Sequence, residues 1–145
     1  MGELKLDKSK DKIESMFDEI APSYDKLNHL FTLNVDIRWR KEIVKYIKNN
    51  KISSSNILDI ATGTGDLAIM MTKTSAKKIV GLDLSAGMLD IGKQKIAAKN
   101  LSDKIEMIQA DSENIPYPDN HFDAITVSFG IRNFETLEKG LAEIY

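Results

Sequence analysis

A strand that runs directly into a glycine turn and then into a helix, at residues 56–68 (NILDIATGTGDLA), constrains the fold more than any other feature of this chain. Three further apolar segments that read as short strands follow it, at 78–82, 105–110 and 122–129. The intervals have helical character, and Ser85 is the predicted N-cap of one of these helices. Strands that alternate with helices form parallel sheets with right-handed crossovers. The sequence therefore predicts an α/β fold with a doubly wound parallel sheet.

The residues before this region follow helical spacing. A first helix, with its apolar residues between 13 and 20, is expected to end at Pro22, because proline disfavours the helical conformation before it and lacks an amide hydrogen. A second helix is predicted to begin with Asp36 as its N-cap. Its expected buried stripe is Ile43, Val44 and Ile47.

These patterns divide the chain into two parts of one domain. The segment 24–36 is interpreted as a turn-rich lid, and the polar run KISSSN at 51–56 as a junction. Residues 1–50 are expected to form a helical cap, and residues 51–145 the core. The last predicted helix, 135–145, reaches the end of the chain without a cap, so the closing C-terminal strands of such a sheet are expected to be missing from this chain.

Composition excludes several classes of function. The 145 residues carry 20 Lys plus Arg and 22 Asp plus Glu, a net charge of −2, which lacks the basic excess of a nucleic-acid-binding protein. The absence of cysteine and the presence of only two histidines argue against a disulfide framework and against a bound metal. There is no secretory signal and no apolar run of membrane-spanning length. We therefore expect a cytoplasmic protein.

The glycine turn is a candidate ligand loop. Gly63 and Gly65 allow a tight turn and a close approach of a ligand to the backbone, and Ala68 allows the helix to pack closely on the strand. Asp83 follows the second strand twenty residues after Gly63, the offset at which an acidic residue binds the ribose of an adenosine-type cofactor. A tight turn without a ligand is the alternative. The carboxylate of Asp59 favours a cationic sulfonium over a pyrophosphate, and hence S-adenosylmethionine over a nicotinamide dinucleotide.

Four segments resemble the class I methyltransferases that C-methylate quinone precursors in menaquinone and ubiquinone biosynthesis: LDIATGTGDLA, GLDLSAGML, QADSENIPYPDNHFD and FGIRNF. The N-terminal segment YDKLNHLFTLNVDIRWR also resembles that family's signature. Thr32 and Asn34 stand where the family usually has serine and glycine. Thr32 keeps a hydroxyl group, and asparagine tolerates the left-handed conformation. The resemblance implies a Rossmann-like sheet that binds S-adenosylmethionine.

The resemblance also implies roles in cofactor binding. Thr62 and the loop backbone would contact the methionine half of S-adenosylmethionine, and Asp83 the ribose. Asp111 and Ser112 would lie at the adenine edge, and Ser128 would close the pocket. Met88, on the first turn of its helix, is placed to pack on the adenine face. Turn capping by Asp111 and core packing by Met88 are the alternatives.

The acceptor side requires groups that bind an ionised ring hydroxyl. Arg132 follows the fourth strand, where ligands of α/β sheets collect, and is the candidate to stabilise a phenolate, with Asn133 on the second ring oxygen. Pairing of Arg132 with Glu135 is the alternative.

The lid segment offers Tyr24, Asp25 and His29 as groups that orient the quinol or take its proton, although a lone histidine is more often structural. Trp39 is expected to anchor the core rather than to lie at a membrane interface.

The sequence thus predicts S-adenosylmethionine-dependent C-methylation of a prenylated quinol ring, converting demethylmenaquinol to menaquinol or serving ubiquinone synthesis. Methylation of another small molecule, a nicotinamide-dependent oxidoreductase and a cofactor-binding piece without activity are the alternatives. A lipid-soluble acceptor implies peripheral contact with the inner face of the cytoplasmic membrane. The oligomeric state is left open.

Overall fold

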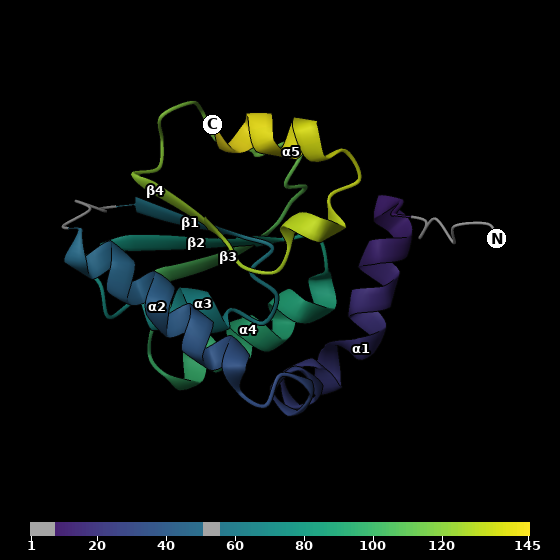
Figure 1. Cartoon of the computed structure of the whole chain (residues 1–145), viewed down its shortest axis with the longest axis horizontal. Coiled ribbons are helices and arrows are strands. Elements are labelled where there is room, and N and C mark those ends of the chain that lie inside the picture. Colours follow the sequence, from purple (N-terminus) through teal and green to yellow (C-terminus); the bar gives the residue numbers. More distant parts are fainter. Residues whose placement is uncertain (1–7, 51–55) are drawn as a thin grey trace.

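The computed structural model describes residues 8–50 and 56–145 (Figure 1). Its sheet has the strands β1 (Asn56–Ile60), β2 (Lys78–Asp83), β3 (Ile105–Gln109) and β4 (Ala124–Val127). Its α-helices are α1 (Lys10–Phe31), α2 (Val35–Asn49), α3 (Asp66–Met71), α4 (Ala86–Ala98) and α5 (Leu137–Ile144), with a short 3₁₀ helix, η1, at Ile131–Asn133. The predicted junction at 51–56 lies outside the described residues except for Asn56.

The sheet is parallel throughout the described chain, in the order β3-β2-β1-β4. Ile57 of β1 is in register with Ile79 of β2 on one side and with Ala124 of β4 on the other. The direction of winding therefore reverses between β1 and β4, which confirms the doubly wound prediction. In such sheets the ligand site lies beyond the carboxyl ends of the strands at this reversal.

Alternate residues of the strands lie in two apolar layers, one on each face of the sheet. Ile57 and Ile79 face a core that α2, α3 and α4 cover, and this core includes Val44 and Ile47 of the predicted α2 stripe. Leu58 and its neighbours on the other face pack against Phe134 and the α5 residue Ile144. Figure 1 shows α5 above the sheet and α2, α3 and α4 below it.

Helix α1 lies across the carboxyl ends of the strands and does not end at Pro22 as predicted (Figure 1). It continues for nine more residues, changing direction on the way. Contacts on both sides of the proline hold the two parts in place: Asp18 accepts hydrogen bonds from the Gly87 amide (2.9 Å) and the Ser85 hydroxyl, and Asp25 binds Lys95. The predicted turn-rich lid is therefore mostly helical.

A tight corner joins α1 to α2. Leu33 and Asn34 both have left-handed backbones, with φ of 50° and 63°, which confirms the expectation that asparagine serves there in place of glycine. The N-cap position of α2 is Asn34, not Asp36, which is buried within the first helical turn. None of the helices in the described ranges is both long and apolar enough to span a membrane.

Candidate cofactor and acceptor site

The glycine turn after β1 has the left-handed conformations that its sequence predicts. Gly63 and Gly65 have φ of 57° and 80°, a backbone conformation that residues with a side chain rarely adopt. A Cβ at Gly63 would meet no atom within 4 Å, whereas one at Gly65 would press on Met107 at 3.2 Å. The loop therefore exposes bare backbone at Gly63 and packs closely at Gly65.

Asp83 contacts this loop directly. Its Oδ2 accepts a 2.8 Å hydrogen bond from the Gly63 amide, and its Oδ1 accepts a 3.0 Å bond from the Ser85 amide. Burial raises the pKa of Asp83, and the backbone hydrogen bonds partly oppose that rise. The twenty-residue offset thus corresponds to a physical contact between the ends of β1 and β2.

Asp59 lies beneath the loop and is 1% exposed. It accepts hydrogen bonds from the hydroxyls of Thr62 (2.7 Å) and Thr126 (2.8 Å). Burial raises its pKa to about 6, although both hydrogen bonds act in the opposite direction. Asp59 therefore orders the loop through Thr62, and its contact with a cationic ligand stays a prediction.

A small cavity of about 40 Å³ lies at these strand ends. Its lining joins the loop, β1, the segment after β4, α1, α2 and α3, and includes Tyr24, Arg40, Asp59, Thr62 and Ser128. Known ligand pockets have volumes of roughly 300–1,000 Å³. A nucleoside-sized molecule therefore does not fit this cavity unless its lining, which includes Tyr24 of α1 and Arg40 of α2, moves apart.

At the opposite end of α1, Lys10 closes over the predicted adenine edge. Its Nζ lies 2.6 Å from Asp111 Oδ2 and 3.2 Å from Glu113 Oε2. Burial raises the pKa of Asp111, but the hydrogen bonds from Lys10 and the Glu113 amide, together with the charge of Lys10, hold the pKa below its usual value. Ser112 is half-buried beside it. Met88 is 1% exposed, in line with the core alternative, so its contact with adenine stays a prediction.

Among the acceptor candidates, Tyr24 and Arg132 lie within electrostatic reach of each other. Burial raises the pKa of the Tyr24 hydroxyl, and the charges of Arg40 and Arg132 oppose this rise. Arg132 is exposed on η1, and Asn133 beside it is half-buried. In the described part of the chain Glu135 pairs with Lys10 at 3.8 Å and not with Arg132.

Asp25 is tied to the core. The Thr64 hydroxyl donates to its Oδ1 (2.5 Å) and the Lys95 ammonium to its Oδ2 (2.6 Å). Lys95 also binds Asp66. Burial raises the pKa of Asp25, but the bonds from Lys95 and Thr64 hold it below its usual value. This geometry fits a positioning residue better than a base, and the proton-transfer role stays a prediction.

His29 belongs to a second polar cluster. Its Nδ1 lies 2.9 Å from Asp36 Oδ2, which also accepts from Arg40 (2.8 Å), while the Thr32 hydroxyl donates to Oδ1 (2.7 Å). Burial raises the pKa of Asp36, but Thr32, Arg40 and His29 lower it below its usual value. Thr32 thus supplies the hydroxyl expected at its position.

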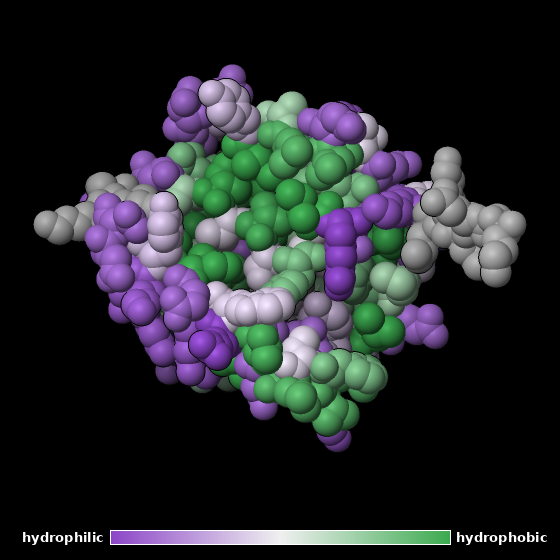
Figure 2. Space-filling model, in the orientation of Figure 1, coloured by the Kyte–Doolittle hydropathy of each residue, from purple (hydrophilic) through white to green (hydrophobic). Residues whose placement is uncertain are grey.

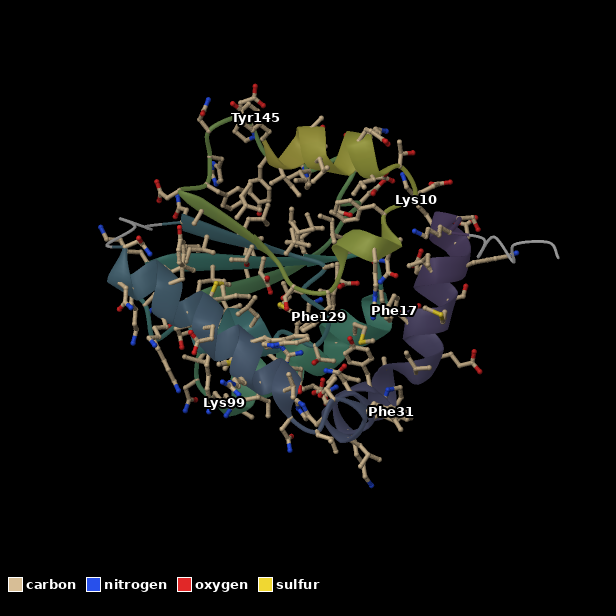
Figure 3. All side chains as sticks on the ribbon, in the orientation of Figure 1. Lys10, Phe17, Phe31, Lys99, Phe129 and Tyr145 are labelled. Carbon is tan, nitrogen blue, oxygen red and sulfur yellow. The ribbon has the colours of Figure 1, made fainter. Side chains whose placement is uncertain are left out.

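Trp39 is not a core residue, contrary to expectation. It is 54% exposed, and its ring stacks on Phe129 with a centroid distance of 5.4 Å and an interplanar angle of 27°. Figure 3 shows Phe129 beyond the end of β4, on the side that α1 covers. Phe129 has a left-handed backbone, with φ of 65°. The structure thus adds an aromatic pair beside the cavity.

Sequence reasoning missed Lys10, Lys95, Asp66 and Arg40. Arg40 had one local signal, the four-residue spacing from Asp36 on a helix. The two lysines had none, because their partners lie 101 and 70 residues away. Within the described ranges, no group of three or more acidic or histidine side chains is arranged to hold a metal ion.

A doubly wound sheet with a glycine loop held by an acidic residue at the end of the next strand defines a protein of the nucleoside-cofactor-binding α/β class. The family model described as "ubiE/COQ5 methyltransferase family" matches residues 5–145, and the chain belongs to this family.

Two relatives show the extent of the similarity. The chain is 44% identical to the "Demethylmenaquinone methyltransferase" of Bacteroides fragilis over 95% of its length, and 44% identical to the "Ubiquinone/menaquinone biosynthesis C-methyltransferase UbiE" of Geotalea daltonii over 97%. It spans 56% and 60% of those proteins.

Solved structures share the fold. A crystal structure of a protein from Methanococcus maripaludis covers 100% of the chain, with 31% identity and a TM-score of 0.67; the chain covers 61% of that protein. A "SAM dependent methyltransferase from Aquifex aeolicus" covers 96% at 20% identity, with a TM-score of 0.64, and the chain covers 65% of it. The latter likeness concerns the fold alone.

Proposed function

We propose that the chain forms the S-adenosylmethionine-binding part of an enzyme that C-methylates a prenylated quinol ring, with demethylmenaquinol as the acceptor. The observation that carries the proposal is the hydrogen bond from Gly63 to Asp83 at the reversal point of the sheet, in a member of the ubiE/COQ5 family. Both named relatives support a quinol acceptor, and the one from Bacteroides fragilis is named for demethylmenaquinone alone.

The residues present fit S-adenosylmethionine. A Cβ at Gly63 would meet no atom within 4 Å, so the loop backbone there has room for a ligand atom once the cavity has opened. Asp83 is placed to bind ribose hydroxyls, and Thr62 with the loop backbone to bind the methionine half. Asp111 and Ser112 would hold the adenine edge once Lys10 moves away.

When bound, S-adenosylmethionine supplies an activated methyl group, so the protein needs no nucleophilic side chain. Its residues must position the acceptor, exclude water and stabilise the negative charge of the ring hydroxyl. Arg132 would meet that charge and Asn133 the second ring oxygen. Tyr24 would orient the ring, and the Trp39–Phe129 pair would offer it an aromatic surface.

Calorimetry with S-adenosylmethionine, S-adenosylhomocysteine and NAD⁺ tests the cofactor. We expect the first two to bind and NAD⁺ not to bind, and the reverse preference would favour the oxidoreductase alternative. Quinones extracted from a strain that lacks the gene test the acceptor. Accumulation of demethylmenaquinone, reversed by the complete gene product, is the expected result, and an unchanged quinone pool would contradict it.

A further inference from the structure

The corner between α1 and α2 exposes a group of large apolar side chains. Leu30, Phe31 and Leu33 are 64%, 80% and 81% exposed, and Leu27 and Val35 beside them are exposed as well. Figure 2 shows apolar atoms protruding at the lower edge of the molecule, where Figure 3 labels Phe31. Single exposed apolar residues are ordinary, but a contiguous group indicates an interaction surface.

Three polar side chains near the same corner point inward. Buried Asp36 accepts hydrogen bonds from Asn28 (3.1 Å), Thr32 (2.7 Å) and Arg40 (2.8 Å). Leu33 has the left-handed φ of 50°, which is strained for a bulky side chain. If solubility were the only requirement at this corner, its polar side chains would face the solvent and its large apolar side chains would be buried. Here a buried polar cluster and a strained turn hold leucine and phenylalanine in solvent.

Between positions 26 and 41, the exposed charges are of one sign. Lys26, Arg38 and Lys41 are exposed, whereas the one acidic residue between positions 26 and 41 is Asp36, which is buried. A second copy of the chain docked symmetrically on this corner would bring like charges together. An apolar tip with a basic border instead complements an anionic lipid surface.

We propose that the α1–α2 corner, residues 27–35, inserts into the interface of an anionic lipid bilayer. The basic side chains would contact the headgroups, and the leucines and Phe31 would enter the acyl boundary. Because α1 also contributes Tyr24 to the cavity lining, insertion would hold this side of the cavity near the bilayer. The proposal rests on the proposed function in one respect: a lipid-soluble acceptor is the reason that contact with the bilayer would be useful.

Flotation with vesicles tests the proposal directly. We expect the purified protein to float with vesicles of phosphatidylcholine and phosphatidylglycerol, more weakly with phosphatidylcholine alone, and less as salt is raised. The variant Leu30→Ser/Leu33→Ser should lose at least about tenfold in vesicle affinity. Tyr46→Ser, which removes another exposed side chain three turns along α2, is the control and should bind like the wild type.

Two outcomes would overturn the proposal: a wild-type protein that stays unbound in low salt, or a double variant that floats as well as the wild type. Sedimentation adds a third outcome: the wild type is a dimer that does not bind vesicles, and the double variant is a monomer. Equal thermal melting of both proteins shows that folding is intact. Calorimetry with S-adenosylmethionine separates the two proposals, because the corner variant should keep its cofactor affinity whether or not it binds lipid.

Discussion

Among individual side chains, Asp59 makes the most specific prediction about pH. Its pKa of about 6 lies above the 3.8 of an unperturbed carboxyl, so the folded chain binds this proton more tightly than the unfolded chain. Lowering the pH from about 7 to about 4 should therefore stabilise the wild type relative to Asp59→Asn, by about 1–3 kcal/mol. Urea unfolding across this range measures the difference.

The exposed residue Asp90 provides the control for Asp59. Its replacement by asparagine removes a carboxyl that only approaches Lys93 at 3.9 Å. The stability difference between Asp90→Asn and the wild type should change little over the same range. If the difference in stability between Asp59→Asn and the wild type stayed constant across this pH range, the buried carboxyl of Asp59 would not cause the pH dependence.

Asp83 should contribute mainly to cofactor affinity. Asp83→Ala removes the acceptor for the Gly63 amide and the proposed ribose ligand, so we expect S-adenosylmethionine binding to weaken by about 1.5–3 kcal/mol, roughly tenfold to a hundredfold in Kd. Calorimetry measures this loss, with Asp90→Ala as the matched control. An unchanged Kd would mean that the ribose is bound elsewhere.

Arg132 should act on the rate instead. A cation that meets charge developing in the transition state typically contributes about a hundredfold to a thousandfold in kcat. Arg132→Ala in the complete gene product should lose this factor, while Arg132→Lys, which keeps the charge without the planar fork, should retain part of it. Cofactor affinity is the internal control. Wild-type turnover of Arg132→Ala, or joint loss of folding and cofactor binding, would contradict the role.

The position of helix α1 depends on its contacts with α4. Lys95→Met removes the ammonium group that binds Asp25 and Asp66, and leaves these two carboxylates facing each other. We expect a loss of about 1–2 kcal/mol in stability and faster amide exchange along residues 10–31. The control is Lys93→Met, whose side chain is more exposed. Equal exchange in both variants would mean that other contacts hold α1.

Local patterns were sufficient to predict the core elements, because each strand and its following turn has its own signal. The glycine loop, the Ser85 cap and the stripe of α2 all lie in single segments. The path of α1 was not predictable in this way. The local cost of Pro22 favours a helix end, and only contacts with Gly87 and Lys95, far along the chain, outweigh it.

The candidate site likewise has parts that local sequence patterns predict and parts that depend on contacts between distant residues. The twenty-residue offset assigned Gly63 and Asp83 to one predicted cofactor site, and the strand order brings the two residues into contact. The polar partners of Asp25 and Asp111 were not, because they depend on how α1 lies across the sheet. Trp39 was misassigned because an aromatic residue on a helix usually belongs to the core, whereas here it covers Phe129 at the surface.

For the molecule as a whole, cofactor binding should appear as thermal stabilisation. A ligand at about a hundred times its Kd adds about 2.7 kcal/mol to the folded state, which for a chain of this length raises Tm by about 5–10 °C. We expect S-adenosylmethionine and S-adenosylhomocysteine to produce this shift. NAD⁺ at the same concentration is the control, and an equal shift with NAD⁺ would contradict the proposed selectivity.

The cavity of about 40 Å³ beneath α1 also has a kinetic consequence. It has room for a few water molecules, so no nucleoside reaches the glycine loop by diffusion alone. Entry must wait for a helix to withdraw, a motion of the kind that takes microseconds to milliseconds. In stopped-flow mixing, the observed rate should therefore rise with ligand concentration and then level off at the opening rate. The observed rate for a variant without Lys95 should reach a higher plateau, because α1 would withdraw more often.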